Sequence, residues 1–107
     1  MASDLFVGTL DILILKAVSW GPRHGYAIGR WIRETTENAL VVQEGALYPA
    51  LHRLELRGLL ASAWDLSAAN RRAKYYRLTA SGRKRLKETT ESWRRTSGAI
   101  NRVLDAV

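Results

Sequence analysis

The order of segments along the chain is the strongest constraint on its fold. Apolar residues recur at helical spacing in three stretches, at about 5–20, 24–36 and 44–57. In the third, Leu47, Ala50, Leu51 and Leu54 form one stripe, which predicts its core face. Two short strand-like runs, 59–66 and 74–78, follow with a polar loop between them, and a long helical stretch covers about 80–106. Three helices and then a hairpin predict a winged helix-turn-helix of the mainly α (α+β) class, with a long C-terminal helix.

Residues that end or cap helices occur at the ends of the predicted helices. Gly21-Pro22 ends the first helix, because proline disfavours helical geometry in the residue before it. Gly58 follows the third helix, where a left-handed cap is expected, and Thr79 is the expected N-cap of the last helix. We therefore expect one compact unit, in which residues 1–79 form a winged-helix DNA-binding domain and residues 80–107 a dimerisation helix.

Basic side chains concentrate toward the C-terminus. The net charge is +7, yet residues 1–66 carry 6 basic and 7 acidic side chains, whereas residues 67–107 carry 11 and 3. Between Arg71 and Lys87 there are eight basic residues and no acidic one. Such a block is a candidate phosphate-binding surface. The alternative is a solvated face that keeps the protein soluble.

The composition leaves little from which to build an enzyme. The 107 residues include no cysteine and two histidines, so thiol catalysis, disulfides and thiolate zinc sites are excluded, and we expect neither metal nor cofactor. The longest apolar run, Ile12 to Leu15, is far short of the roughly 20 residues that span a bilayer. Asp4 and Asp11 interrupt any N-terminal signal pattern. A cytoplasmic protein without a membrane partner is expected.

The predicted fold suggests how the chain would contact double-stranded DNA. A helix-turn-helix places its second helix, here 44–57, in the major groove, while the first crosses the backbone. Polar side chains on the outward face of that helix can contact base edges or phosphates, and the hairpin arginines would follow the adjacent backbone or minor groove. The predicted DNA-binding residues are Tyr26, Ala46, Tyr48, Pro49, His52, Arg53, Arg71, Arg72 and Lys74.

Several of these residues have a second interpretation. Tyr48 would equally pack against the second helix, and His52 would equally be an ordinary surface histidine. Tyr26 is as well explained by packing as by a phosphate contact. His24, beside Gly25, suits a turn or a helix cap.

The last helix carries a seam for another helix. Leu86, Trp93, Ile100 and Val107 repeat every seven residues, a spacing typical of helix–helix contacts. Thr89, Thr96 and Val103 occupy the partner positions of this seam. Small or polar residues surround Trp93, so a gap for a planar apolar ligand is one hypothesis. The alternative is that Trp93 anchors a dimer interface.

Taken together, these segments resemble the PadR family of winged-helix transcriptional regulators. The matching stretches are GTLDILIL (8–15), HGYAI (24–28), EGALYPALHRLE (44–55), GLL (58–60) and RRAKYYRLT (71–79), with Gly82. The resemblance implies a homodimeric regulator, usually a repressor, whose C-terminal helix packs on the first and last helices of the partner. The single short C-terminal segment is similar to the smaller PadR subfamily.

The resemblance also extends to an effector site. Glu91-Ser92-Trp93 is similar to the segment with which multidrug-sensing members sandwich planar compounds between two tryptophans. Carried over by position, the neighbours of Trp93 in such a pocket would be Leu5, Asp11, Ile12, Leu86 and Ser97.

The leading hypothesis is therefore a repressor that binds a pseudo-palindromic operator as a homodimer and is released by a small hydrophobic or aromatic effector. The alternative is a non-specific DNA- or RNA-binding winged helix without effector. An enzyme is the third and least supported class.

Overall fold

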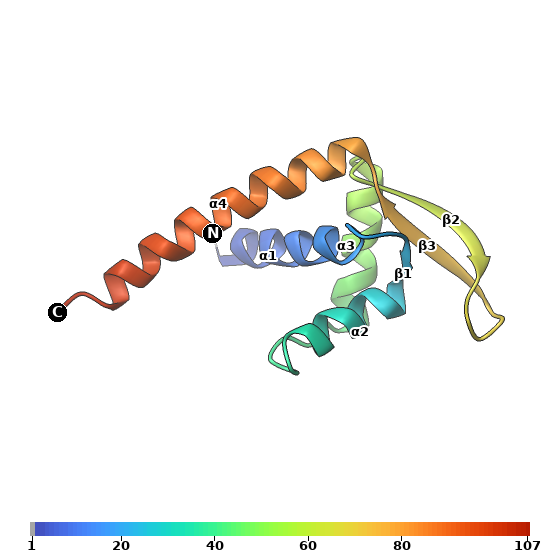
Figure 1. The fold of residues 1–107 in the computed structure, drawn as a ribbon, viewed down its shortest axis with the longest axis horizontal. Coiled ribbons are helices and arrows are strands. Elements are labelled where there is room, and N and C mark those ends of the chain that lie inside the picture. The colour runs from blue at the N-terminus through green and yellow to red at the C-terminus, as the bar shows by residue number, and fades with distance from the viewer. Residues whose placement is uncertain (1) are drawn as a thin grey trace.

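The computed structural model describes residues 2–107, with side chains from residue 8 onward. It has the predicted winged helix-turn-helix architecture with a long last helix (Figure 1). The elements are α1 (Ala2–Ala17), β1 (Arg23–His24), α2 (Gly25–Thr35), α3 (Glu44–Leu56), β2 (Leu60–Leu66), β3 (Arg72–Leu78) and α4 (Ala80–Leu104). We call β2, β3 and the connecting loop 67–71 the wing. None of the described helices is long and apolar enough to cross a membrane.

The sheet contains one strand more than the sequence indicated. Its order is β1-β3-β2, with both pairs antiparallel. The additional strand, β1, pairs Arg23 with Tyr76 and His24 with Tyr75. A two-residue strand has no alternation to detect, which is why it was not predicted. The wing is also longer than expected, because β3 begins at Arg72 and not at Lys74.

The predicted helix ends are largely confirmed. Thr79 caps α4 by accepting a hydrogen bond from the Gly82 amide at 3.0 Å, and Gly58 adopts φ +75° after α3. His24 caps α2, since its Nδ1 accepts a hydrogen bond from the Ala27 amide at 3.1 Å. The first helix ends at Ala17, three residues before the predicted end at Trp20.

One core holds the three N-terminal helices and the sheet together. The α3 stripe is buried as predicted, whereas Trp20 and Tyr26 are exposed, so Tyr26 is not held in the core. The buried residues are Leu10, Ile14, Leu15, Ala17, Val18, Ile28, Ile32, Leu47, Ala50, Leu51, Leu54, Leu59, Leu60, Tyr76 and Leu78.

The first turn of α4 sits directly on the backbone that follows α3. The Thr79 hydroxyl donates to the carbonyl oxygen of Gly58 at 2.7 Å. Gly82 is buried, and a Cβ atom at this position would lie 2.0 Å from the carbonyl oxygen of Leu59. Only glycine permits this approach of α4 to the end of α3.

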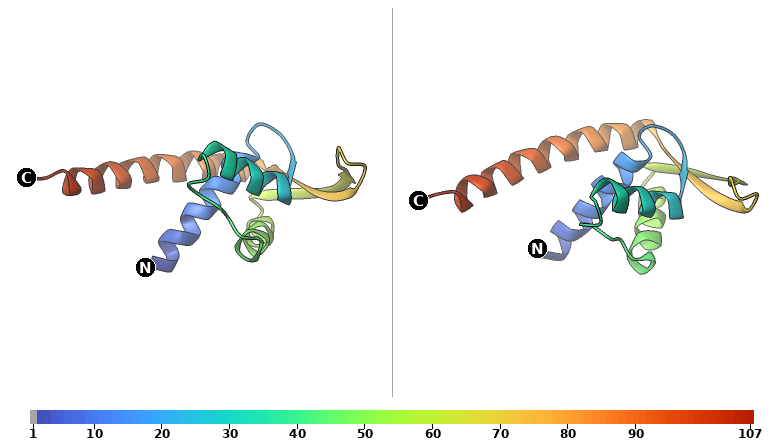
Figure 2. Two further views of the ribbon diagram at one scale, coloured as in Figure 1. Left: turned by 90° about the horizontal axis from the view of Figure 1, so that it is seen from below. Right: turned by 60° about the horizontal axis from the view of Figure 1, so that its bottom comes forward.

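The molecule is elongated because two parts extend beyond the core. Its principal extents are 56 × 29 × 24 Å and its radius of gyration is 15.1 Å. Figure 2 shows α4 and the wing extending in opposite directions. The C-terminal half of α4 therefore lies beyond the rest of the chain.

The close contact at Gly82 predicts a sharp difference between two glycine substitutions. Gly82→Ala forces a methyl group against backbone, and we expect it to lower the free energy of unfolding by about 3 kcal/mol. Gly45→Ala is the control, since a Cβ atom there meets nothing within 4 Å. Denaturant unfolding at one protein concentration measures both, and equal stabilities would contradict the described contact.

Candidate nucleic-acid interface

Helix α3 separates a buried stripe from an outward face. Tyr48, Pro49 and His52 are exposed, as the predicted groove contacts require. Ala46 is not on this face, because it is half-buried and packs against the core. Its role as a DNA contact stays a prediction, but position 46 lies one helical turn before the buried Ala50, at the edge of the core stripe.

Tyr48 combines the two roles considered for it. A Cβ atom on Gly25 would lie 2.7 Å from Cε1 of Tyr48, so the ring rests on the first turn of α2. The side chain is nevertheless 44% exposed. Packing on Gly25 fixes the ring, and the exposed part remains available to a partner.

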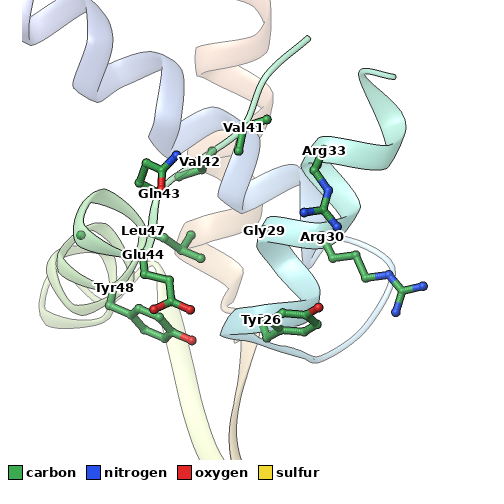
Figure 3. Close-up of a pocket in the computed structure, with 11 residues that line it drawn as sticks. Tyr26, Gly29, Arg30, Arg33, Val41, Val42, Gln43, Glu44, Leu47 and Tyr48 are labelled. Atoms are coloured by element: carbon green, nitrogen blue, oxygen red, sulfur yellow. The ribbon is translucent and has the colours of Figure 1, made fainter. Parts of the chain in front are cut away.

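A groove separates α2 from the N-terminal half of α3 (Figure 3). It has a volume of about 410 Å³, and Tyr26 and Tyr48 lie on its two sides, with Arg33 further along α2. Arg30 also lines it and donates a hydrogen bond to Glu34 at 2.7 Å. Tyr26 and Tyr48, predicted separately from the sequence, are thus brought to one surface.

Arg53 is held by α1 and does not extend freely outward. Its Nη2 donates to Oδ1 of Asp11 at 2.7 Å, and Nη1 of Arg57 lies 3.8 Å from the other carboxylate oxygen. The Nε atom of Arg53 is buried and has no hydrogen-bond partner among the described residues. This ion pair assigns Arg53 a structural contact that its sequence position did not indicate.

The predicted DNA-binding residues of the wing are two exposed arginines and one tethered lysine. Arg71 and Arg72 are exposed at and beside the loop of the wing. Lys74 instead lies on the α3 side, with Nζ 3.1 Å from Oε1 of Glu55. The Ser62 hydroxyl also donates to Glu55, and this hydrogen bond, with the nearby ammonium group, lowers the pKa of the carboxyl. Lys74 therefore joins the wing to α3.

Sequence reasoning did not single out Trp64 of β2. The Arg72 guanidinium lies over its indole, with Cζ 5.0 Å from the ring centroid. The alternation of side chains along β2 could have identified Trp64, because it predicts which residues of the strand share a face. On that face Trp64 lies opposite Lys74 of β3.

A second groove, of about 200 Å³, lies between α1 and α4. It brings Ile12 and Trp93 together, as predicted, and its lining residues are Gly8, Thr9, Ile12, Thr89, Ser92, Trp93 and Thr96.

Three other residues predicted beside Trp93 do not line this groove. Asp11 and Ile12 are consecutive on α1, so their side chains point about 100° apart. Ile12 therefore lines the groove, while Asp11 faces Arg53. Leu86 packs on the core, and the Ser97 hydroxyl donates to the Arg94 carbonyl at 3.4 Å. The side chain of Leu5 lies outside the described residues.

Nothing in the described part of the chain resembles a metal site, since no group of three or more histidine, aspartate or glutamate residues could hold an ion.

Comparison with known proteins gives a consistent family match. Residues 14–88 match the model of the "Transcriptional regulator PadR-like family". An uncharacterised protein of Lysinibacillus sphaericus is 31% identical over 98% of this chain and 96% of its own length.

Solved structures agree with that match. A transcriptional regulator from Clostridium thermocellum has a TM-score of 0.83 and 35% identity, covering 92% of this chain and 96% of its own. A PadR family transcription regulator from Clostridium difficile has a TM-score of 0.77 and 32% identity, covering 89% and 97%.

The lowered pKa of Glu55 predicts a pH-dependent contribution to stability. The carboxylate stabilises the folded state above its ordinary pKa of 4.5, and this contribution is lost as the pH falls through the lower folded-state value. We expect Glu55→Gln to cost about 1 kcal/mol at pH 7 and progressively less as the pH falls below the folded-state pKa of Glu55. Glu88→Gln, on exposed α4, is the control. A cost of Glu55→Gln that stays constant with pH would contradict this assignment.

Proposed function

The chain belongs to the PadR-like family of transcriptional regulators, and on that premise we propose that it is a repressor that binds a two-fold-symmetric operator as a homodimer. In this proposal α3 enters the major groove, α2 crosses the backbone, and the wing follows the adjacent phosphates. In this proposal the protein acts by occupying DNA and not by catalysis.

The observation that carries the proposal is the exposed face shared by α3 and the wing. Tyr48 and His52 point outward from a helix whose opposite stripe is completely buried. The wing is tied to this helix through Lys74 and Glu55, while Arg71 and Arg72 remain exposed. Base-reading and phosphate-binding groups thus lie on one rigid unit.

The dimer is supported by the apolar residues on the second half of α4. Ile100 is 49% and Val103 75% exposed, although both lie on the predicted helix–helix seam. Nothing else in the described chain covers them. A second copy of α4 would bury both residues and place the two α3 helices for successive major-groove faces.

The effector hypothesis rests on the groove around Trp93. The indole is 44% exposed beside small and polar residues, so one face is open to a planar apolar compound. In the proposed dimer, a compound in this groove would also contact the partner chain. Its binding energy would then depend on the arrangement of the two subunits.

The DNA-binding proposal predicts separable effects of two kinds of residue. Arg71→Ala/Arg72→Ala should lower affinity for all sequences and reduce the salt slope of log K by about 2, because two phosphate contacts are lost. His52→Ala should weaken binding to a selected operator duplex by about tenfold with less effect on random DNA. Gel shifts at several salt concentrations measure both.

Arg94→Ala/Arg95→Ala is the matched control, since it removes the same charge from exposed α4. Unchanged affinity in folded, dimeric wing and His52 variants would refute the proposal. An operator-to-random affinity ratio near one would favour the non-specific alternative.

The α4 surface generates one prediction about assembly and effector binding. Ile100→Glu/Val103→Glu should make the protein monomeric, because two charges would be buried at the seam. Sedimentation equilibrium measures the mass.

A planar dye that quenches the parent's tryptophan fluorescence should no longer do so in this variant or in Trp93→Ala.

Leu56→Glu is the control for the added charge, since Leu56 is 74% exposed on α3, away from the seam. A dimeric Ile100→Glu/Val103→Glu variant would exclude this interface. Equal dye quenching in Trp93→Ala and the parent would exclude the effector site.

A further inference from the structure

On one face of the wing, an apolar stripe on β2 lies beside a cationic stripe on β3. Trp64 and Leu66 stand on β2, opposite Lys74 and Arg72 of β3 respectively. Cross-strand partners share a face of the sheet, so all four side chains lie on the same side. Trp64 is 58% and Leu66 61% exposed.

Folding does not explain an exposed tryptophan at this place. The buried residues of the sheet, Leu60, Tyr76 and Leu78, lie at the other end of the strands. The indole instead contacts the Arg72 guanidinium, whose Cζ is 5.0 Å from the ring centroid. This stacking restrains an otherwise flexible arginine while its charge stays in solvent.

Trp64 also borders the candidate interface. A cleft of about 370 Å³ runs between the wing and the helix-turn-helix, with Trp64 and Lys74 on one side and Tyr26 and Tyr48 on the other. The two tyrosines also line the groove of Figure 3. The apolar face of the wing is therefore continuous with the exposed face of α3.

We propose that Trp64 is a DNA-contacting residue, whose indole packs on deoxyribose rings at the edge of the minor groove while Arg72 reaches the flanking phosphate. This inference rests on the proposed function and adds a contact to it. The groove edge presents apolar sugar beside charged phosphate, which complements the two stripes of the wing.

A second copy of the wing is a poorer occupant of this face. A symmetric contact would bring Arg71, Arg72 and Lys74 against the same residues of the other copy, and like charges oppose such a contact. DNA is attracted by the same charges. The observations therefore favour nucleic acid over self-association at the wing.

The test compares two exposed tryptophans in the full-length protein, with a duplex selected from a random pool by the parent. Trp64→Ala should weaken binding about tenfold, as for loss of an aromatic contact with nucleic acid. Trp64→Phe should recover most of the affinity. Trp20→Ala is the matched control, since Trp20 is 64% exposed and has Lys16 Nζ 4.6 Å from its ring centroid, but lines neither cleft.

Salt dependence separates this contact from an ionic one. The salt slope of log K should be unchanged in Trp64→Ala and should fall by about 0.9 in Arg72→Ala. Added duplex should quench the parent's fluorescence, and Trp64→Phe should remove most of that quenching.

Each other result has a distinct meaning. If the parent binds no duplex, the proposed function and this inference both fail. If His52→Ala and the wing arginine variants lose affinity while folded Trp64→Ala binds like the parent, only the inference fails. A lower sedimentation mass for Trp64→Ala would assign the face to self-association and overturn the inference.

Discussion

The contact between the first turn of α4 and the backbone after α3 determines how the working parts of this molecule are placed. Gly82 allows α4 to reach the Leu59 carbonyl, and Thr79 caps the helix while donating to Gly58. The chain leaves α3, forms the wing and returns at this same point. The orientations of α3, the wing and α4 are thus coupled through a few backbone atoms.

Much of the fold follows from local patterns in the sequence. The stripe of α3, the left-handed Gly58 and the Thr79 cap each depend on neighbouring residues, and all three were predicted correctly. The short strand β1 was not, because its two residues pair with β3, about 50 positions away in the sequence. Periodicity detects faces of helices and strands but not such distant pairing.

The candidate interface shows the same division between local and distant information. Exposure of Tyr48 and His52 follows from their position on α3, opposite the buried stripe. The ion pair of Arg53 with Asp11 joins residues 42 positions apart, and the bond of Lys74 to Glu55 joins two elements. The sequence did not indicate an ion-pair partner for Arg53 or Lys74, because charge alone does not identify which residue a side chain will contact.

The elongated shape affects how the protein moves through solution. A compact chain of this length has a radius of gyration of about 13 Å, whereas this one reaches 15.1 Å. The extended α4 and wing raise hydrodynamic drag without adding mass. On a sizing column calibrated with spherical proteins, a single copy would therefore elute early and be mistaken for a larger species. Only shape-independent methods, such as light scattering, count its subunits correctly.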